Sequence, residues 1–246
     1  NNIRKLKKNN DTFNSKSLFE FATCGYSLGL RTLLNGIYSL GPANILTSYK
    51  NKIRICKYFT YHKTLKIDSR KKIKDYLYQL NKIIDDSLDF IIENSNDRTI
   101  YIPLSGGMDS RLIASKFHEK GFKNIKCFSY GLKNNSDALI AKKVADHLNL
   151  KWEYIWFNKD RYRQLFFSSF KEDYDKYSDH FSCIPNYGEI FFLKELKERG
   201  YFTKNPIIIN GQSGDFNSGL HIPSTLYDFD KQGKNNNSSI LESIKK

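Results

Sequence analysis

The chain lacks the features that mark several large classes of protein. No apolar run approaches the roughly 20 residues that a membrane-spanning helix needs, and no secretory signal sequence is visible. The four cysteines, Cys24, Cys56, Cys127 and Cys183, lie far apart and form neither a Cys-x-x-Cys pair nor a zinc-ligand spacing. The sequence therefore argues against a membrane protein, a disulfide scaffold and a zinc module, and it favours the reducing cytoplasm.

Methionine and acidic residues are also scarce. The single methionine is Met108, and because the chain starts at Asn1 we expect a section of a longer or processed protein. Lys and Arg number 40 against 26 Asp and Glu, which gives a formal net charge of +14. The lysines are spread along the chain, so this charge is interpreted as solvated surface, and a nucleic-acid partner is not expected.

Apolar periodicity divides the chain into segments of different kinds. The polar, basic residues 1–17 are interpreted as a linking segment, and short apolar stretches between 19 and 59, broken by Gly and Pro, predict strands and turns. Apolar side chains at three- and four-residue steps predict a long helix over 68–95. Beyond it the chain alternates, with strands expected at 99–104, 124–130, 152–157 and 206–210, and helices at 109–120, 136–148 and 188–199. This order predicts an α/β fold, a parallel sheet with helices on both faces, preceded by a small β-rich segment.

The segment from Ser105 to Ser110, SGGMDS, joins the first strand of this alternation to the helix after it. A loop in this place presents free backbone N–H groups at the positive end of the helix dipole, and its glycines let an anion approach the backbone closely. It has no lysine, which separates it from the Gly-x-x-x-x-Gly-Lys-Ser/Thr loop. Asp109 fits an anion site if a divalent cation accompanies the phosphate. The sequence therefore predicts a loop for a metal-bound phosphate.

A second loop of the same kind follows the last expected strand. Gly211–Asp215, GQSGD, again places glycines, a serine and an aspartate directly after an apolar strand. Ligands of parallel sheets bind beyond the carboxyl ends of the strands, so both loops are expected at one edge of the sheet. Nearby, Arg111 either reaches a phosphate or lies on a solvated helix face, and Asp137 is interpreted as a first-turn helix acid.

These stretches carry a resemblance to a known family. Ser105–Ser110 resembles the pyrophosphate loop of the N-type ATP pyrophosphatases, the PP-loop superfamily, and Leu104–Leu112 is most similar to the synthetase domain of the asparagine synthetase family. Three further stretches resemble that family's adenine-contacting strand, its next helix and its second loop: residues 128–131, 137–150 and 207–219. Phe216 departs from the pattern, because the family usually has an acid there.

The resemblance implies a fold and a set of ligands. The fold is that of the adenine nucleotide alpha hydrolases, and the cofactors are ATP and Mg²⁺. Asp109 and Asp215 are the implied catalytic residues and metal ligands. The residues implied in cofactor binding are Leu104, Ser105, Gly106, Gly107, Met108, Asp109, Ser110, Ser129, Gly131, Gly211, Ser213 and Gly214. Ser129 is interpreted equally well as an ordinary strand-end serine.

The N-terminal part resembles a second module of the same family. Gly25–Leu46 is similar to the last part of a class II glutaminase domain. Residues 1–65 are therefore expected to be the C-terminal part of such a domain with a linker, and residues 66–246 the ATP-pyrophosphatase synthetase domain, truncated at its C-terminus. Glutaminase domains use an N-terminal cysteine as nucleophile, whereas this chain has Asn1 and an internal Cys24, so glutaminase activity is not assigned.

The implied activity is an ATP-dependent amidation of a small-molecule carboxylate. It forms AMP and pyrophosphate through an acyl-adenylate, with ammonia or an amine as nitrogen donor. No membrane partner is expected, and a homodimer is a candidate assembly. Two alternatives stay open: a tRNA-modifying PP-loop enzyme, which would use the basic charge, and a catalytically degraded nucleotide-binding relative, to which Phe216 and the missing N-terminal cysteine point.

Overall fold

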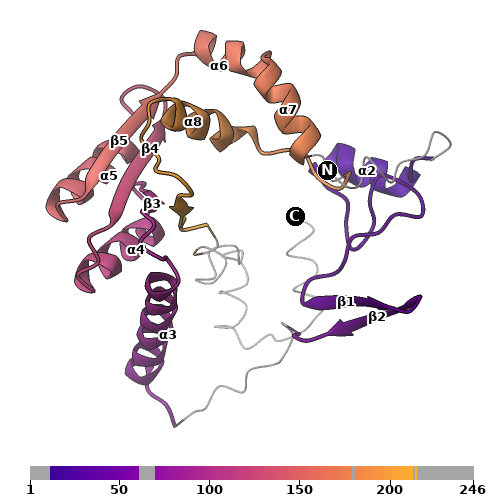
Figure 1. The fold of residues 1–246 in the computed structure, drawn as a ribbon, viewed down its shortest axis with the longest axis horizontal. Helices are drawn as coiled ribbons and strands as arrows, with labels where there is room; N and C mark the ends of the chain where they lie inside the picture. The colour runs from indigo at the N-terminus through magenta and orange to yellow at the C-terminus, as the bar shows by residue number, and fades with distance from the viewer. Residues whose placement is uncertain (1–11, 61–69, 179–180, 213, 215–246) are drawn as a thin grey trace, which may run out of the picture. The chain divides into compact units, whose positions relative to one another are not determined.

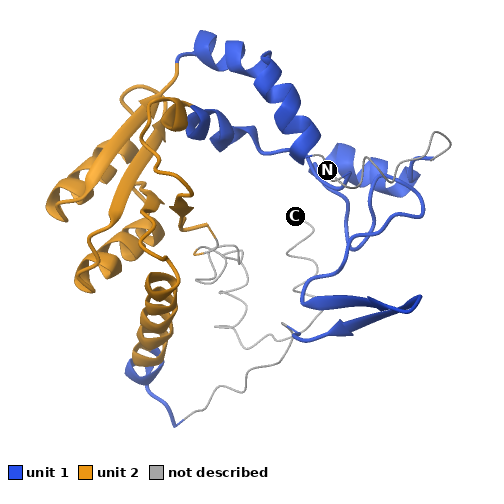
Figure 2. Ribbon diagram, in the orientation of Figure 1, with its two compact units in different colours: residues 1–76, 158–194 blue, residues 77–157, 195–246 orange. Residues whose placement is uncertain are grey.

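The computed structural model describes residues 12–60, 70–178, 181–212 and 214 (Figure 1). The chain divides into two compact units that interleave along the sequence (Figure 2). The first comprises residues 1–76 and 158–194, and the second residues 77–157 and 195–246. The sequence predicts one boundary between residues 65 and 66, and that domain division stays a prediction.

The second unit is built on a parallel sheet of four strands in the order β5-β4-β3-β6. The strands are β3 (Ile100–Pro103), β4 (Ile125–Gly131), β5 (Lys151–Trp156) and β6 (Ile207–Ile208). Its alternation of short apolar strands with helices is what the sequence predicts, so the expected α/β fold is confirmed. The small β-rich segment before it is also present, as a two-stranded antiparallel sheet.

Three helices cover one face of this sheet: α3 (Ile73–Glu93), α4 (Met108–Glu119) and α5 (Ser136–His147). Alternate residues of β3 explain the layering, because neighbouring side chains of a strand point to opposite faces. Ile100 and Ile102 are fully buried in the core cluster with Phe117 of α4. Tyr101 points to the other face, where its ring packs edge-on against Phe202, just beyond α8 (Tyr187–Glu198).

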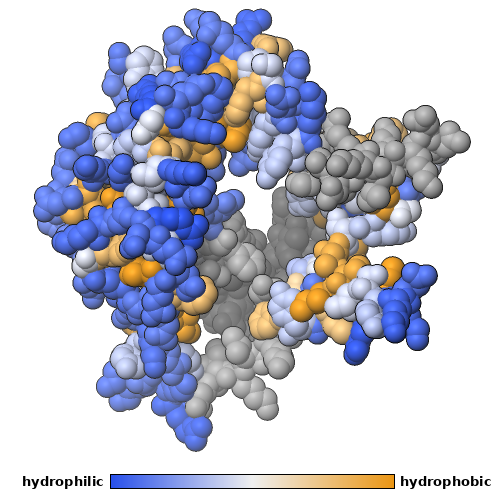
Figure 3. All heavy atoms as spheres, in the orientation of Figure 1, coloured by the Kyte–Doolittle hydropathy of each residue, from blue (hydrophilic) through white to orange (hydrophobic). Residues whose placement is uncertain are grey.

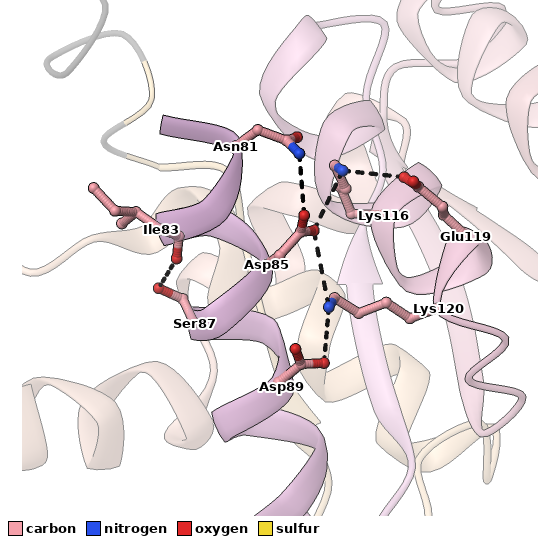
Figure 4. A network of polar contacts seen from close by, with 8 residues as sticks. All are labelled: Asn81, Ile83, Asp85, Ser87, Asp89, Lys116, Glu119 and Lys120. Atoms are coloured by element: carbon pink, nitrogen blue, oxygen red, sulfur yellow. Dashed lines mark hydrogen bonds and ion pairs between the residues drawn. The ribbon is translucent and has the colours of Figure 1, made fainter. Parts of the chain in front are cut away.

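Helices α3 and α4 are joined by a ladder of ion pairs (Figure 4). Lys116 Nζ lies 3.3 Å from Asp85 Oδ1, and Lys120 Nζ lies 2.8 Å from Asp89 Oδ1. Asp85 and Asp89 are four residues apart on α3, and Lys116 of α4 is four residues before Lys120, which caps that helix, so the members of each pair lie on one side of their helix. The ladder fixes α4 against α3, and α4 begins at the predicted phosphate loop.

The first unit contains α2 (Ser15–Cys24), the hairpin of β1 (Asn44–Tyr49) and β2 (Lys52–Lys57), then α6 (Lys159–Phe166), α7 (Ser169–Ser178) and most of α8. Helix α2 begins inside the segment interpreted as a linker and continues into the stretch where strands and turns are predicted, so both interpretations are wrong for Ser15–Cys24. Its start is set by Asn14, whose side chain accepts a hydrogen bond from the Ser17 N–H, and its end by Gly25 in the left-handed conformation. These two capping residues mark a helix locally, whereas the polar composition of residues 1–17 favours a linker.

The hairpin turns at Lys50 and Asn51, which both adopt positive φ, 45° and 60°. Every residue of β2 is exposed, and so is most of β1. Apolar side chains are therefore visible on this hairpin in the hydropathy view (Figure 3): Ile45, Leu46, Ile53 and Ile55. Across the described ranges of the chain, no helix combines the length and hydrophobicity that crossing a membrane takes.

Candidate active site

The phosphate loop predicted from the sequence connects β3 to α4. Leu104, the first residue after β3, is buried, and its N–H donates to the carbonyl oxygen of Phe128 on β4 at 2.8 Å. Gly107 is the residue that precedes α4, with φ −70° and ψ 162°, and no side chain caps the helix there. The first turn of α4 therefore presents backbone N–H groups that no capping side chain takes up, together with the positive end of the helix dipole.

Two serines close the loop on itself. Ser110 Oγ accepts from the Ser105 N–H at 3.0 Å, and the two hydroxyl oxygens are also 3.0 Å apart. Ser105 Oγ accepts in addition from the Gly107 N–H at 3.1 Å. Arg111 joins this arrangement by donating from Nε to the Gly107 carbonyl at 3.0 Å. Ser110 is buried, whereas Ser105 and Gly107 face solvent, so the loop holds its shape by internal bonds and keeps an open outer side.

The second loop lies directly against the first. β6 adds to β3, with the Ile209 N–H donating to the Tyr101 carbonyl at 2.9 Å, and the loop follows at once. A Cβ at Gly211 would lie 2.9 Å from the Ser110 backbone nitrogen, and a Cβ at Gly214 would lie 2.2 Å from Asp109 Cγ. At Gly211 most of the close atoms are backbone, so only glycine allows this approach there. The Asp109 carboxylate therefore lies against the backbone of the second loop.

The two predicted metal ligands are described unequally. Asp109 is half-buried in the first turn of α4. Asp215 and Ser213 lie outside the described residues, so their predicted roles stay predictions. Among the residues that the structure describes, no group of three or more His, Cys, Asp or Glu side chains is placed to hold a metal ion.

Ser129 and Gly131 lie at the carboxyl end of β4, beside the phosphate loop. The Ser129 hydroxyl is buried and engaged inside the protein: it donates to the Leu104 carbonyl at 2.6 Å and accepts from Trp152 Nε1 at 2.8 Å. A contact of this residue with adenine would therefore come from its backbone. Gly131 has φ +150°, and a Cβ there would lie 2.6 Å from Asn135 Nδ2.

One residue of the site was not singled out as a site residue by the sequence. Asp137 lies in the first turn of α5, as predicted, and Asn135 caps that helix by accepting from the Asp137 N–H at 2.8 Å. A Cβ at Gly106 would lie 2.7 Å from Asp137 Oδ1 and 3.2 Å from Asp137 Cα. The N-terminus of α5 thus touches the phosphate loop, and no local sequence pattern could show this contact, because Gly106 and Asp137 lie far apart in the chain.

Burial beneath the site changes the ionisation of two groups. Desolvation raises the pKa of the Cys127 thiol on β4 to about 12. It also raises the pKa of Tyr201, whose hydroxyl donates to the Cys127 carbonyl at 2.6 Å. Both groups therefore stay protonated at neutral pH and serve packing and hydrogen bonding under the loops.

The structure thus gathers most of the predicted site at one edge of the sheet. A family model for asparagine synthase matches residues 93–216, half of the chain, and this range contains both loops. The chain belongs to the asparagine synthase family. The N-terminal stretch that resembles a glutaminase lies outside the matched range, and that resemblance stays a prediction.

Comparison with solved structures adds two distant similarities. An NH₃-dependent NAD synthetase from Campylobacter jejuni, in complex with nitrate, is 17% identical with a TM-score of 0.37, over 56% of this chain and 58% of that one. A predicted subunit of tRNA methyltransferase from Methanocaldococcus jannaschii is 16% identical with a TM-score of 0.28, over 47% of this chain and 53% of that one. This chain thus spans little more than half the length of each. The search of curated proteins found no match.

Proposed function

We propose that this asparagine synthase family member adenylates a small-molecule carboxylate with ATP and then amidates it. The observation that carries the proposal is the packing of the second loop on Asp109, because it brings two glycine-rich loops from separate parts of the chain to one sheet edge. In parallel sheets this edge is where ligands bind. The reducing cytoplasm is the proposed location, as the separated cysteines predict.

The residues of the site suit the groups that the proposal needs. The first turn of α4, at Gly107 and Met108, would receive the β and γ phosphates through backbone N–H groups. Asp109 offers a carboxylate, the hard oxygen donor that Mg²⁺ prefers, and Asp215 would offer another, because it follows Gly214 in the chain. When bound, magnesium would neutralise the charge that develops on the leaving pyrophosphate.

The proposed reaction has two steps. A carboxylate oxygen attacks the α phosphorus, the bond to the bridging oxygen of the β phosphate breaks, and pyrophosphate leaves with its electron pair. Ammonia or an amine then attacks the acyl carbon of the adenylate, and AMP leaves as the amide forms and a proton is released. The protein's part in the first step is to hold phosphates and carboxylate in line, which the internally bonded loop is suited to do.

The test is pyrophosphate release from ATP and Mg²⁺ with a panel of carboxylates, aspartate first, in the presence of ammonia. We expect one carboxylate to stimulate release and Asp109→Asn to lower the rate by about 10²-fold or more, because it removes the charge but keeps the shape. The matched control is Asp146→Asn, because Asp146 is an exposed aspartate of α5 that pairs with Lys142 on the same helix. Release stimulated by tRNA and by no carboxylate would contradict the proposal.

A further inference from the structure

Two side-chain hydrogen bonds in series, here called the relay, connect β5 through β4 to Leu104, the residue that follows β3 and precedes the phosphate loop. Trp152 on β5 donates from Nε1 to Ser129 Oγ at 2.8 Å, and Ser129 on β4 donates to the Leu104 carbonyl at 2.6 Å. The direction of both bonds is fixed, because an indole N–H can only donate and a carbonyl can only accept. The single hydroxyl proton of Ser129 is therefore committed to Leu104.

Leu104 directly precedes Ser105, the first residue of the phosphate loop. It lies one residue beyond β3, where the chain leaves the strand for the loop. Its N–H is bonded to the Phe128 carbonyl at 2.8 Å, and its carbonyl is bonded to Ser129. Both polar groups of the residue before Ser105 are thus fixed, which sets the direction in which the loop leaves the sheet.

The environment of the relay makes it rigid. Ser129 is 5% exposed, and the Trp152 ring packs against the core cluster and stacks on Tyr154 at a centroid distance of 5.8 Å. Register supports the same geometry, because Trp152 pairs with Cys127, two residues before Ser129 on the same face of β4. Buried polar groups in such a place keep their partners, because leaving one unpaired costs its full desolvation.

We propose that Trp152 and Ser129 are positioning residues for the phosphate loop, acting through the Leu104 carbonyl. Neither side chain contacts nucleotide in this proposal. Their effect on ATP turnover rests on the function proposed above, whereas their effect on the loop itself does not. The two can therefore be measured separately.

The first measurement is amide hydrogen exchange of the segment 101–114, followed by mass spectrometry on the full chain. Ser129→Ala is expected to speed exchange in this segment by about 3- to 10-fold, and Trp152→Phe, which keeps an aromatic ring but removes the donor, by less. Ser129→Thr, which keeps the hydroxyl, should restore the wild-type rate. Trp156→Phe is the matched control, because Trp156 lies on the same strand with 43% exposure and contacts Lys133.

The second measurement is the kinetics of pyrophosphate release. Loss of positioning should raise KM for ATP by about 3- to 10-fold in Ser129→Ala and change kcat less. A wild-type exchange rate at 101–114 in both Ser129→Ala and Trp152→Phe would overturn the relay, whatever the kinetics. Faster exchange in these variants, combined with a wild-type chain that releases no pyrophosphate, would support the relay and refute the proposed function. If Ser129→Ala does not fold, Trp152→Phe and Ser129→Thr decide the question.

Discussion

Gly211 is required by the neighbour that it touches rather than by its own backbone angles. A Cβ at this position would lie 2.8 Å from Asp109 Cβ and 3.1 Å from the Asp109 carbonyl carbon, and the Ser110 nitrogen is equally close. Most of these atoms are backbone, so they cannot turn away as the end of a side chain can. At Gly214 the clashing atoms are those of the Asp109 carboxyl group, which can rotate.

The two glycines therefore predict different defects. Gly211→Ala should displace the second loop or the start of α4 and lower pyrophosphate release by roughly 10-fold or more, since small misplacements of reacting groups are costly. Gly214→Ala should turn the Asp109 carboxylate away and raise the Mg²⁺ concentration needed for half-maximal release. Gly188→Ala, whose Cβ would meet only Asn186 Oδ1 at 3.2 Å, is the control. Wild-type kinetics in Gly211→Ala would contradict the close approach of the loops.

Cys127 gives a prediction about thiol chemistry. With its pKa raised to about 12 by burial, the Cys127 thiol stays almost entirely protonated at pH 8. Iodoacetamide at pH 8 should therefore alkylate the exposed Cys24, Cys56 and Cys183 and leave Cys127 unmodified until the protein unfolds. Peptide mass spectrometry measures this, and alkylation of Cys127 at the rate of Cys183 in the folded protein would refute it.

The raised pKa of Cys127 also makes the free energy of unfolding depend on pH. The folded state keeps the Cys127 proton while the unfolded chain releases it, because the unfolded thiol ionises near its ordinary pKa. Stability from this group is complete below about pH 9 and is lost as the pH rises toward 12. Cys127→Ala should remove this dependence, which chemical denaturation at several pH values would show.

At the scale of elements, the contact between α3 and α4 depends on charged groups that are only partly shielded. The Lys116 side chain is 11% exposed, whereas the carboxylates of Asp85 and Glu119 are 31% and 69% exposed. Hydrogen bonding to Glu119, followed by Asp85, raises the pKa of Lys116 above its ordinary value. Water screens the exposed partners, so the ladder orients the helices more than it stabilises them.

Lys116→Met keeps the apolar stem and removes the charge. We expect the midpoint of thermal unfolding to fall by a few degrees at pH 7, because Asp85 loses its closer cation and is left with Lys120, whose Nζ lies 3.8 Å away. Since the pKa of Lys116 is raised, the difference from wild type should persist below the ordinary lysine pKa and disappear as the pH rises through the raised value. Lys142→Met, in an exposed pair within α5, should change little. Equal effects of both substitutions would contradict a specific role for the ladder.

At the scale of the whole molecule, the sequence predicts best what is periodic and contiguous. The alternation from residue 99 to 157 appears as β3, α4, β4, α5 and β5 almost at the expected boundaries, because each element buries its own apolar face. Asn158 opens α6, with its side chain accepting from the Arg161 N–H. The motif SGGMDS lies where a strand meets a helix, which any loop of this chemistry requires.

The features that could not be predicted from the sequence are mostly contacts between residues far apart in the chain. The direction of the Ser129 hydroxyl depends on Trp152, 23 residues later, and the contact of Gly106 with Asp137 depends on how two helix starts are spaced across the sheet. Helix α2 did not follow from the sequence because its buried side chains are Ser17 and Glu20, whereas Leu18 and Phe19 are exposed, so no buried apolar stripe marks it. The strand expected at 206–210 shortens to Ile207–Ile208, which pairs with Ile100 and Tyr101 of β3.

The strand order also determines which parts of the sheet are synthesised first. β3, β4 and β5 follow one another within residues 100–156, whereas β6 begins at Ile207 and must insert beside β3 from far along the chain. On a ribosome, the first loop, with its anchor on Leu104, can therefore mature while the segment that carries Gly211 is still untranslated. The loop that starts at Ser105 is thus synthesised well before the loop that carries Gly211, so the proposed site is completed only once the later segment has been made.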